Sequence, residues 1–226
     1  MYQKKSLVKK SILLLLLFSI TLSFSGCNTK EEEEVSEQIN YITFTDSLGR
    51  SVSVPEGTID AAVLVGSLAD IWNLSGGNIL ATAKDAWEDF NLDLPDAVKL
   101  GTVKAPDTEL LLSVAPPFVI ASSNTTSNID LLPILEEAGI TVAYFEIANF
   151  SDYLDMLKIC TDITGRKDLY EKNGTTINEK IYATTQKFLA EEIPEEEKKY
   201  LLLRASSGVV KAKGSDSYVL GSMLKT

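Results

Sequence analysis

Four short runs of apolar residues alternate with helix-like segments, and this alternation limits the possible folds more than any other feature of the sequence. The runs at 61–65 and 118–121 are continuously apolar, and the other two each contain a single threonine. Such runs are typical of strands that are buried on both faces. The segments between the runs carry apolar residues at helical spacing and end at Gly or Pro. Strands that alternate with helices indicate an α/β fold with a parallel sheet and right-handed crossovers. The four runs are residues 61–65, 79–83, 118–121 and 140–144.

Local patterns predict further elements around these strands. Residues 41–46 and 50–54 alternate apolar and polar side chains around a turn with Gly49, which predicts a β-hairpin. Residues 84–96 are polar and aromatic without a helical period, and residues 128–138 are expected to form one helix.

Two serines are expected to cap helices. Ser67 precedes the first apolar stripe and is followed three residues later by Asp70, as in a capping box. Ser151 is expected to cap the helix that Gly165 closes.

Residues 166–192 carry a single apolar stripe interrupted by Gly174, which predicts one long helix. Residues 200–203 are then expected to form a buried strand, which needs a sheet with helices on both faces. A self-sufficient α/β domain usually needs roughly 100 residues. We therefore interpret residues 198–226, with a strand at 209–213 and a helix from 218, as the start of an incomplete second lobe. A small appendage on the first domain is the alternative.

The amino terminus has the pattern of an export signal. Residues 1–26 combine a basic start with an apolar stretch that is too short for a comfortable membrane span, which predicts a signal peptide. The small residues before Cys27 resemble the bacterial lipobox, in which this cysteine is lipidated. A secreted protein with a stray cysteine is the alternative. Residues 27–40 include four consecutive glutamates and are expected to form an acidic, solvated tether.

Charge and residue content exclude several classes of function. The 226-residue chain has 21 Lys and Arg against 32 Asp and Glu, a net charge of −11, which makes nucleic acid a poor partner. Histidine is absent from the sequence, which excludes Ser-His-Asp and Cys-His catalysis and histidine-ligated metal sites. If Cys27 is lipidated, Cys160 has no cysteine partner within the chain. We expect no catalytic residues, no metal site and no enzymatic activity.

An ordered set of motifs resembles the substrate-binding lipoproteins of ABC importers for iron-siderophores, haem and cobalamin. The resemblance extends over residues 41–226. One departure is Pro117, which follows Pro116 where the family usually has aspartate. The matching motifs are TDSLGR (45–50), LVGSLAD (64–70), PDTE (106–109), VIA (119–121), GITV (139–142) and ITGR (163–166).

The resemblance implies a parallel-sheet lobe joined by a long rigid helix to a second α/β lobe, which is incomplete here. Residues 41–165 would form the N-terminal ligand-binding lobe and residues 166–192 the interlobe helix. An iron chelate or corrinoid would bind as cargo in the cleft, without an intrinsic cofactor. The protein would be a monomer, anchored outside the cytoplasm to the cell membrane by lipidated Cys27 alone, and would deliver its cargo to an ABC permease.

The cleft walls would come from loops at the carboxyl ends of the strands. Trp87 is the best candidate contact because an aromatic face suits a flat chelate, although a surface cluster with Phe90 explains it equally well. Lys84 and Arg204 are candidates to pair with anionic oxygens, although ordinary surface charges are at least as common. The remaining candidates are Ser67, Ser122, Ser123, Asn124, Glu146 and Tyr144, the last as a phenolate ligand of haem or as a core residue.

The resemblance also implies a role for Glu109, because a glutamate at this motif position in the family docks on an arginine of the permease. The same side chain would complement the dipole of the helix that begins beside it, and both roles are compatible. The alternative function for the whole chain is a truncated binding or adhesion lipoprotein that does not take part in transport.

Overall fold

The computed structural model describes residues 39–191, 194, 197, 199–206 and 208–214. The expected signal peptide, Cys27, nearly all of the tether and the helix expected from residue 218 lie outside these residues. Within the described ranges, no helix has both the length and the apolar character needed to cross a membrane.

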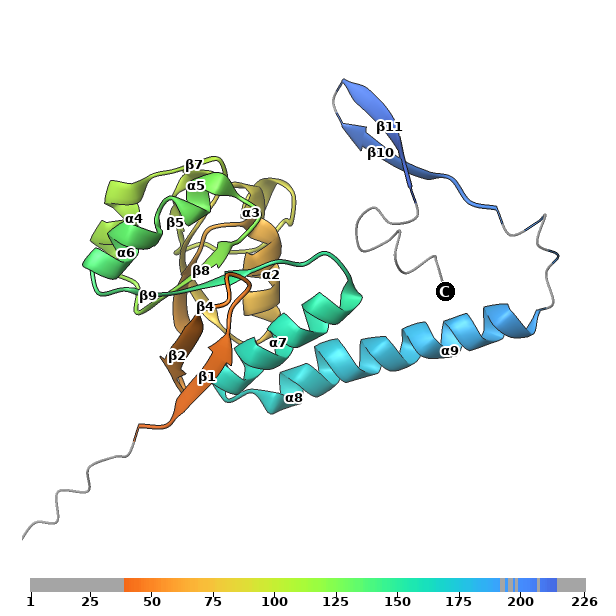
Figure 1. Ribbon diagram of the computed structural model, residues 1–226, viewed down its shortest axis with the longest axis horizontal. Coiled ribbons are helices and arrows are strands. Elements are labelled where there is room, and N and C mark those ends of the chain that lie inside the picture. Colours follow the sequence, from red (N-terminus) through yellow and green to blue (C-terminus); the bar gives the residue numbers. More distant parts are fainter. Residues whose placement is uncertain (1–38, 192–193, 195–196, 198, 207, 215–226) are drawn as a thin grey trace, which may run out of the picture. The chain divides into compact units, whose positions relative to one another are not determined.

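A five-stranded parallel sheet forms the centre of the lobe, as the alternation of strands and helices predicts (Figure 1). Its strands are ordered β5-β4-β3-β8-β9, and every neighbouring pair is parallel. The fold is therefore α/β, and the carboxyl ends of these strands meet at one edge of the sheet. The strands are β3 (Asp60–Val63), β4 (Asn78–Thr82), β5 (Val98–Lys99), β8 (Phe118–Ser122) and β9 (Thr141–Phe145).

Helices cover both faces of the sheet, which explains why the central strands are continuously apolar. On one face, α2 (Gly66–Leu74) and α7 (Phe150–Thr164) bury Trp72 and Leu157 in a cluster with strand residues. On the other face, α4 (Thr108–Val114) and α6 (Leu132–Glu137) contribute to a second cluster. The short helix α5 (Thr126–Ile129) precedes α6.

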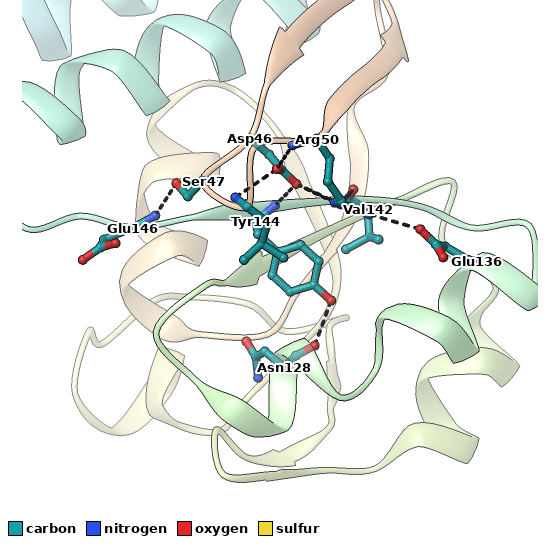
Figure 2. Close-up of polar contacts among 9 residues, drawn as sticks. Asp46, Ser47, Arg50, Asn128, Glu136, Val142, Tyr144 and Glu146 are labelled. Atoms are coloured by element: carbon teal, nitrogen blue, oxygen red, sulfur yellow. Dashed lines mark hydrogen bonds and ion pairs between the residues drawn. The ribbon is translucent and has the colours of Figure 1, made fainter.

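The amino-terminal hairpin of β1 (Tyr41–Thr45) and β2 (Ser51–Pro55) is antiparallel, as expected. Its tip lies against the edge strand β9 (Figure 2). The backbone N–H of Ser47 donates to the carbonyl of Tyr144 at 2.8 Å, and Arg50 Nη2 donates to the carbonyl of Val142 at 2.7 Å. The hairpin tip thereby satisfies backbone groups of β9 that would otherwise form an open edge.

Several local expectations about helices are wrong. Ser67 lies inside α2, whose N-cap is the extended residue Val65 without a side-chain hydrogen bond. The cap of α7 is Asn149, which forms a reciprocal capping box with Asp152, so Ser151 lies within the helix. The single helix expected at 128–138 is divided into α5 and α6, because proline lies at the start of α6 and favours a new first turn there.

Two stretches form elements that the sequence did not indicate. Residues expected to be irregular include the short helix α3 (Asp85–Glu88). A small antiparallel pair, β6 (Gly101–Thr102) and β7 (Ala105–Pro106), precedes α4.

The long helix is confirmed over 24 residues, but it is not uniformly α-helical. It begins as α8 (Lys167–Tyr170), continues through a π-helical turn, η2 (Glu171–Thr175), and ends as α9 (Thr176–Ala190). Gly174 is buried in this turn, where an added Cβ would lie 3.3 Å from Leu157 and 3.2 Å from Tyr170. The absence of a side chain at Gly174 thus allows the helix backbone to pack closely on α7.

The carboxyl-terminal strands differ from the expected buried strand. β10 (Leu202–Ser206) pairs with β11 (Val209–Lys213) as a two-stranded antiparallel hairpin. Leu201 is 72% exposed and Leu203 is 53% exposed. The expectation of burial is wrong for these residues because, within the described part of the chain, β10 joins no larger sheet.

Candidate ligand-binding site

Strands β3, β4, β8 and β9 end at the edge of the sheet where most of the sequence-derived site residues are found. In parallel α/β sheets, ligands bind outside the carboxyl ends of the strands. Arg204 is the exception, because it lies on β10 in the separate carboxyl-terminal hairpin. The candidates on the loops that follow the four strands are Ser67, Lys84, Trp87, Ser122, Ser123, Asn124 and Glu146.

Trp87 lies on α3 and is half-buried, with part of its ring against the core cluster of α2 and α7. Trp87 therefore contributes in part to the core. The ammonium group of Lys99 lies 4.7 Å from the centre of its indole ring, a cation–π distance. An aromatic ring and a cation thus form one unit at this edge of the sheet.

The sequence did not point to Lys99, because its place depends on strand register. Lys99 is the last residue of the two-residue strand β5 and pairs with Thr82 of β4. It has no carboxylate within ion-pair distance among the described residues. Lys84 differs, because its ammonium group lies 3.6 Å from the carboxylate of Glu88. Unlike Lys84, Lys99 therefore has no competing carboxylate in the described structure.

Asp85 connects the Trp87 segment to helix α2. The backbone N–H of Gly66, the first residue of α2, donates to Oδ2 of Asp85 at 2.9 Å. Burial raises the pKa of Asp85 above its ordinary value, and the hydrogen bond from Gly66 opposes this shift. Its other oxygen, Oδ1, is buried without a hydrogen-bond partner in the described structure.

Some polar groups of the loop after β8 form hydrogen bonds within the loop itself. The backbone N–H of Asn124 donates to Oγ of Ser122 at 3.2 Å, so that hydroxyl stabilises the turn. Ser123 Oγ is buried and has no hydrogen-bond partner among the described residues. Asn124 is exposed. It lines a pocket of about 430 Å³ together with Val103, Lys104, Thr125, Thr126 and Ser127.

Glu146 is exposed just beyond β9, and its backbone N–H donates to Oγ of Ser47 at 3.0 Å. The loops after β8 and β9 are adjacent, because the Ser123 N–H donates to the carbonyl of Phe145 at 3.1 Å. The structure therefore brings Glu146 and Ser123 together at the edge of the sheet (Figure 2 shows Glu146). Ser67 is exposed in the first turn of α2.

Tyr144 is not accessible to a ligand, so its assignment as a candidate iron ligand is corrected. Its side chain is fully buried, its hydroxyl donates to the carbonyl of Asn128 at 2.9 Å, and the Arg50 guanidinium lies 5.1 Å from its ring centre. Burial raises the pKa of Tyr144 to about 12, although the nearby Arg50 charge opposes this shift. An enclosed hydroxyl that already donates to a backbone carbonyl is not placed to ligate the iron of a bound haem.

Glu109 is exposed in the first turn of α4. The cap of this helix is Asp107, which accepts a hydrogen bond from the Leu110 N–H at 2.9 Å. Glu109 can therefore complement the helix dipole while its carboxylate remains open to a partner. Across the described residues, no group of three or more Cys, Asp or Glu side chains is placed to hold a metal ion.

A family model for periplasmic binding proteins matches residues 62–224. The chain belongs to the periplasmic binding protein family. This is a family of binding proteins and not of enzymes, in agreement with the expectation from the sequence. A search of curated protein sequences gave no significant match.

Solved structures of binding proteins share the fold. The siderophore-binding protein BauB, bound to a complex of two acinetobactin molecules and ferric iron, is 17% identical with a TM-score of 0.64. The periplasmic catecholate-siderophore binding protein VctP from Vibrio cholerae is 12% identical with a TM-score of 0.62. For both, the match covers 79% of this chain and 63% of the other chain.

The petrobactin-binding protein YclQ from Bacillus subtilis is 17% identical with a TM-score of 0.60, over 79% of this chain and 62% of the other. The chain of this binding protein thus spans less than two thirds of the length of these structures.

Proposed function

We propose that this chain is an extracytoplasmic substrate-binding lipoprotein that delivers a ferric chelate to an ABC importer. The observation that carries this proposal is the family match over residues 62–224. Siderophore-binding proteins among the solved structures of the same fold favour an iron chelate over a corrinoid as cargo. Cobalamin and haem remain the alternatives that the experiment compares.

The Trp87–Lys99 unit is the proposed centre of cargo recognition. Catecholate chelates present flat rings with anionic oxygens, to which an aromatic side chain offers contact area and an ammonium group offers charge. Asn124, Ser123 and Glu146 are proposed to line the site from the adjacent loops, and Arg204 is proposed to contribute from the carboxyl-terminal hairpin. Lys84 and Ser67 are proposed as peripheral contacts, because Lys84 already pairs with Glu88.

A fluorescence titration tests the binding function. The full chain, solubilised in mild detergent, is titrated separately with ferric 2,3-dihydroxybenzoate, haem and cyanocobalamin. The ferric complex is expected to quench tryptophan emission in the wild type and much less in Trp87→Phe, because Trp72 is fully buried in the core. If none of the three probes binds, the proposal is wrong; if cyanocobalamin or haem alone binds, the cargo assignment is wrong.

Lipidation of Cys27 and docking through Glu109 belong to the same proposal. Cys27→Ser is expected to move the protein from the membrane fraction to the soluble fraction, because the serine lacks the thiol that would carry the anchoring acyl chains. Glu109→Ala is expected to lower uptake of the chelate and to leave its affinity unchanged. Glu137→Ala, which removes another exposed carboxylate, is the matched control. Equal uptake by both variants would contradict the docking role.

A further inference from the structure

We propose that Asp85 is a positioning residue, which holds the Trp87-bearing helix α3 at the amino terminus of α2. This inference rests on the proposed ligand-binding role of Trp87. It assigns a specific task to a carboxylate that is not expected to touch the ligand.

Helix α2 has no cap of its own, and Asp85 supplies one. Its N-cap residue, Val65, has no oxygen in its side chain, and its first turn contains no acidic residue. Asp85 Oδ2 accepts a hydrogen bond from the Gly66 N–H at 2.9 Å. A carboxylate at this position satisfies one of the unpaired first-turn donors and faces the positive end of the helix dipole.

The backbones of α2 and α3 approach each other closely at Gly66. A Cβ at this position would lie 2.7 Å from the backbone nitrogen of Ala86 and 2.8 Å from Cδ2 of Phe90. Ala86 is fully buried in the same core cluster as residues of α2. The absence of a side chain at Gly66 is therefore what allows Asp85 to reach the end of α2.

Helix α3 depends on such contacts because it contains four residues, far fewer than an isolated helix needs in water. Ala86 fixes one side of the helix in the core, and Asp85 fixes its first turn to α2. Trp87 is the next residue along this short turn. The contacts of its two predecessors thus fix the backbone from which the indole ring projects, while the core cluster and Lys99 contact the ring itself.

The contacts of the Asp85 carboxylate also indicate that it positions helix α3 more than it stabilises the fold. Its Oδ1 atom is buried without a partner in the described structure, and a half-satisfied buried carboxylate is costly. Burial raises the pKa of Asp85, in agreement with that cost. A residue chosen for stability alone would be expected to satisfy both oxygens.

The test compares three variants of the full chain in mild detergent. Asp85→Ala removes the cap, Asp85→Asn keeps an oxygen that can accept the Gly66 N–H, and Asp89→Ala removes an exposed carboxylate in the same segment. The first readout needs no ligand: it is the quenching of Trp87 emission by acrylamide, with Trp72 as the buried reference. The second is affinity for ferric 2,3-dihydroxybenzoate.

We expect Asp85→Ala to raise the quenching constant of Trp87 about twofold and to weaken affinity about fivefold, the equivalent of one lost helix cap. Asp85→Asn should restore most of both properties, and Asp89→Ala should leave both unchanged. Unchanged quenching in Asp85→Ala, or a failure of Asp85→Asn to recover, would overturn the proposal. If the wild type binds no probe, the proposed function fails, whereas the quenching comparison still decides the role of Asp85.

A further measurement on the wild type covers the case in which Asp85→Ala does not fold. Amide hydrogen exchange should show the Gly66 N–H to be protected more than tenfold relative to the N–H of Ser67, the next first-turn donor, because a closed hydrogen bond slows exchange. Equal exchange of the two amides would show that Asp85 does not hold α2, and the proposal would be wrong.

Discussion

Asp46 and Arg50 form a double contact at the tip of the amino-terminal hairpin, in which Oδ2 of Asp46 lies 3.1 Å from Nε and 2.8 Å from Nη2 of Arg50. The Asp46 side chain is fully buried. Its Oδ1 atom also accepts the backbone N–H groups of Leu48 and Arg50, and Oδ2 accepts that of Tyr144 (Figure 2). One carboxylate thus joins the hairpin to the edge of the sheet.

Asp46→Ala is expected to destabilise the lobe by about 3–5 kcal/mol, because the backbone N–H groups of Leu48, Arg50 and Tyr144 lose their acceptor and the Arg50 guanidinium loses its nearest carboxylate. Urea unfolding followed by circular dichroism measures this loss. Asp168→Ala is the control, since it breaks a fully solvated pair with Arg166 and should change the midpoint little. Similar midpoints for the two variants would show that the hairpin contact does not stabilise the lobe.

The phenol of Tyr144 should make stability depend on pH in alkaline solution. Burial raises the pKa of Tyr144 to about 12 in the folded protein, against about 10 in an unfolded chain. The stabilisation by the neutral phenol is therefore complete below about pH 10 and is lost as the pH rises towards about 12. Urea midpoints at a series of pH values should fall more steeply in the wild type than in Tyr144→Phe. Parallel curves would contradict this linkage.

Gly77→Ala should be strongly destabilising because a Cβ at this position would overlap the indole ring of Trp72. Trp72 is fully buried, and its Nε1 donates to the carbonyl of Asn78 at 3.0 Å, so the ring cannot move without losing that bond. Overpacking of this kind costs about 1–3 kcal/mol or more. Thermal unfolding measures the loss, and Gly208→Ala, with no atom within 4 Å of its added Cβ, should leave the melting temperature unchanged.

Lys99→Met should weaken binding of ferric 2,3-dihydroxybenzoate more than Lys84→Met does. Both changes keep an apolar stem and remove one positive charge, but only Lys84 is paired with a carboxylate in the described structure. We expect a loss of about three- to tenfold for Lys99→Met, the size of one partly exposed ion pair with the anionic chelate. Titrations at low and high salt measure the effect, which should shrink as salt screens the charge. An equal loss in both variants would contradict the special role of Lys99.

The layers of the lobe could be predicted from the sequence because burial on both faces leaves a continuous apolar run. The run at 118–121 corresponds to β8, and the run at 140–144 to β9 displaced by one residue. Strand β5 and helix α3 were not predicted. The strand has two residues and the helix four, which is too short for the alternation of a strand or the 3.6-residue period of a helix to appear in the sequence.

The site was less predictable, because its geometry depends on contacts between residues that are distant in sequence. The cap of α2 comes from Asp85, 19 residues after Gly66, so the nearby Ser67 was a misleading candidate. Lys99 reaches Trp87 only through the register of β4 and β5. For Tyr144 the sequence was more informative. Its position in an apolar strand already indicated a role in the core as the alternative to iron ligation, and the residue lies in the core.

The π-turn at Glu171–Thr175 changes the angular phase of the long helix. Its hydrogen bond runs from the Thr176 N–H to the carbonyl of Glu171, so the turn holds one residue more than an α-helical turn. Tyr170 and Ile177 are then offset like residues six positions apart, about 240° around the axis, rather than about 340° for seven positions. Tyr170 packs against the core cluster, whereas Ile177, 38% exposed, lies at the start of α9, in which no residue is buried. The apparent single stripe of the sequence is two stripes out of phase, and deleting one residue within the turn would yield a straight α-helix without rotating the residues beyond it.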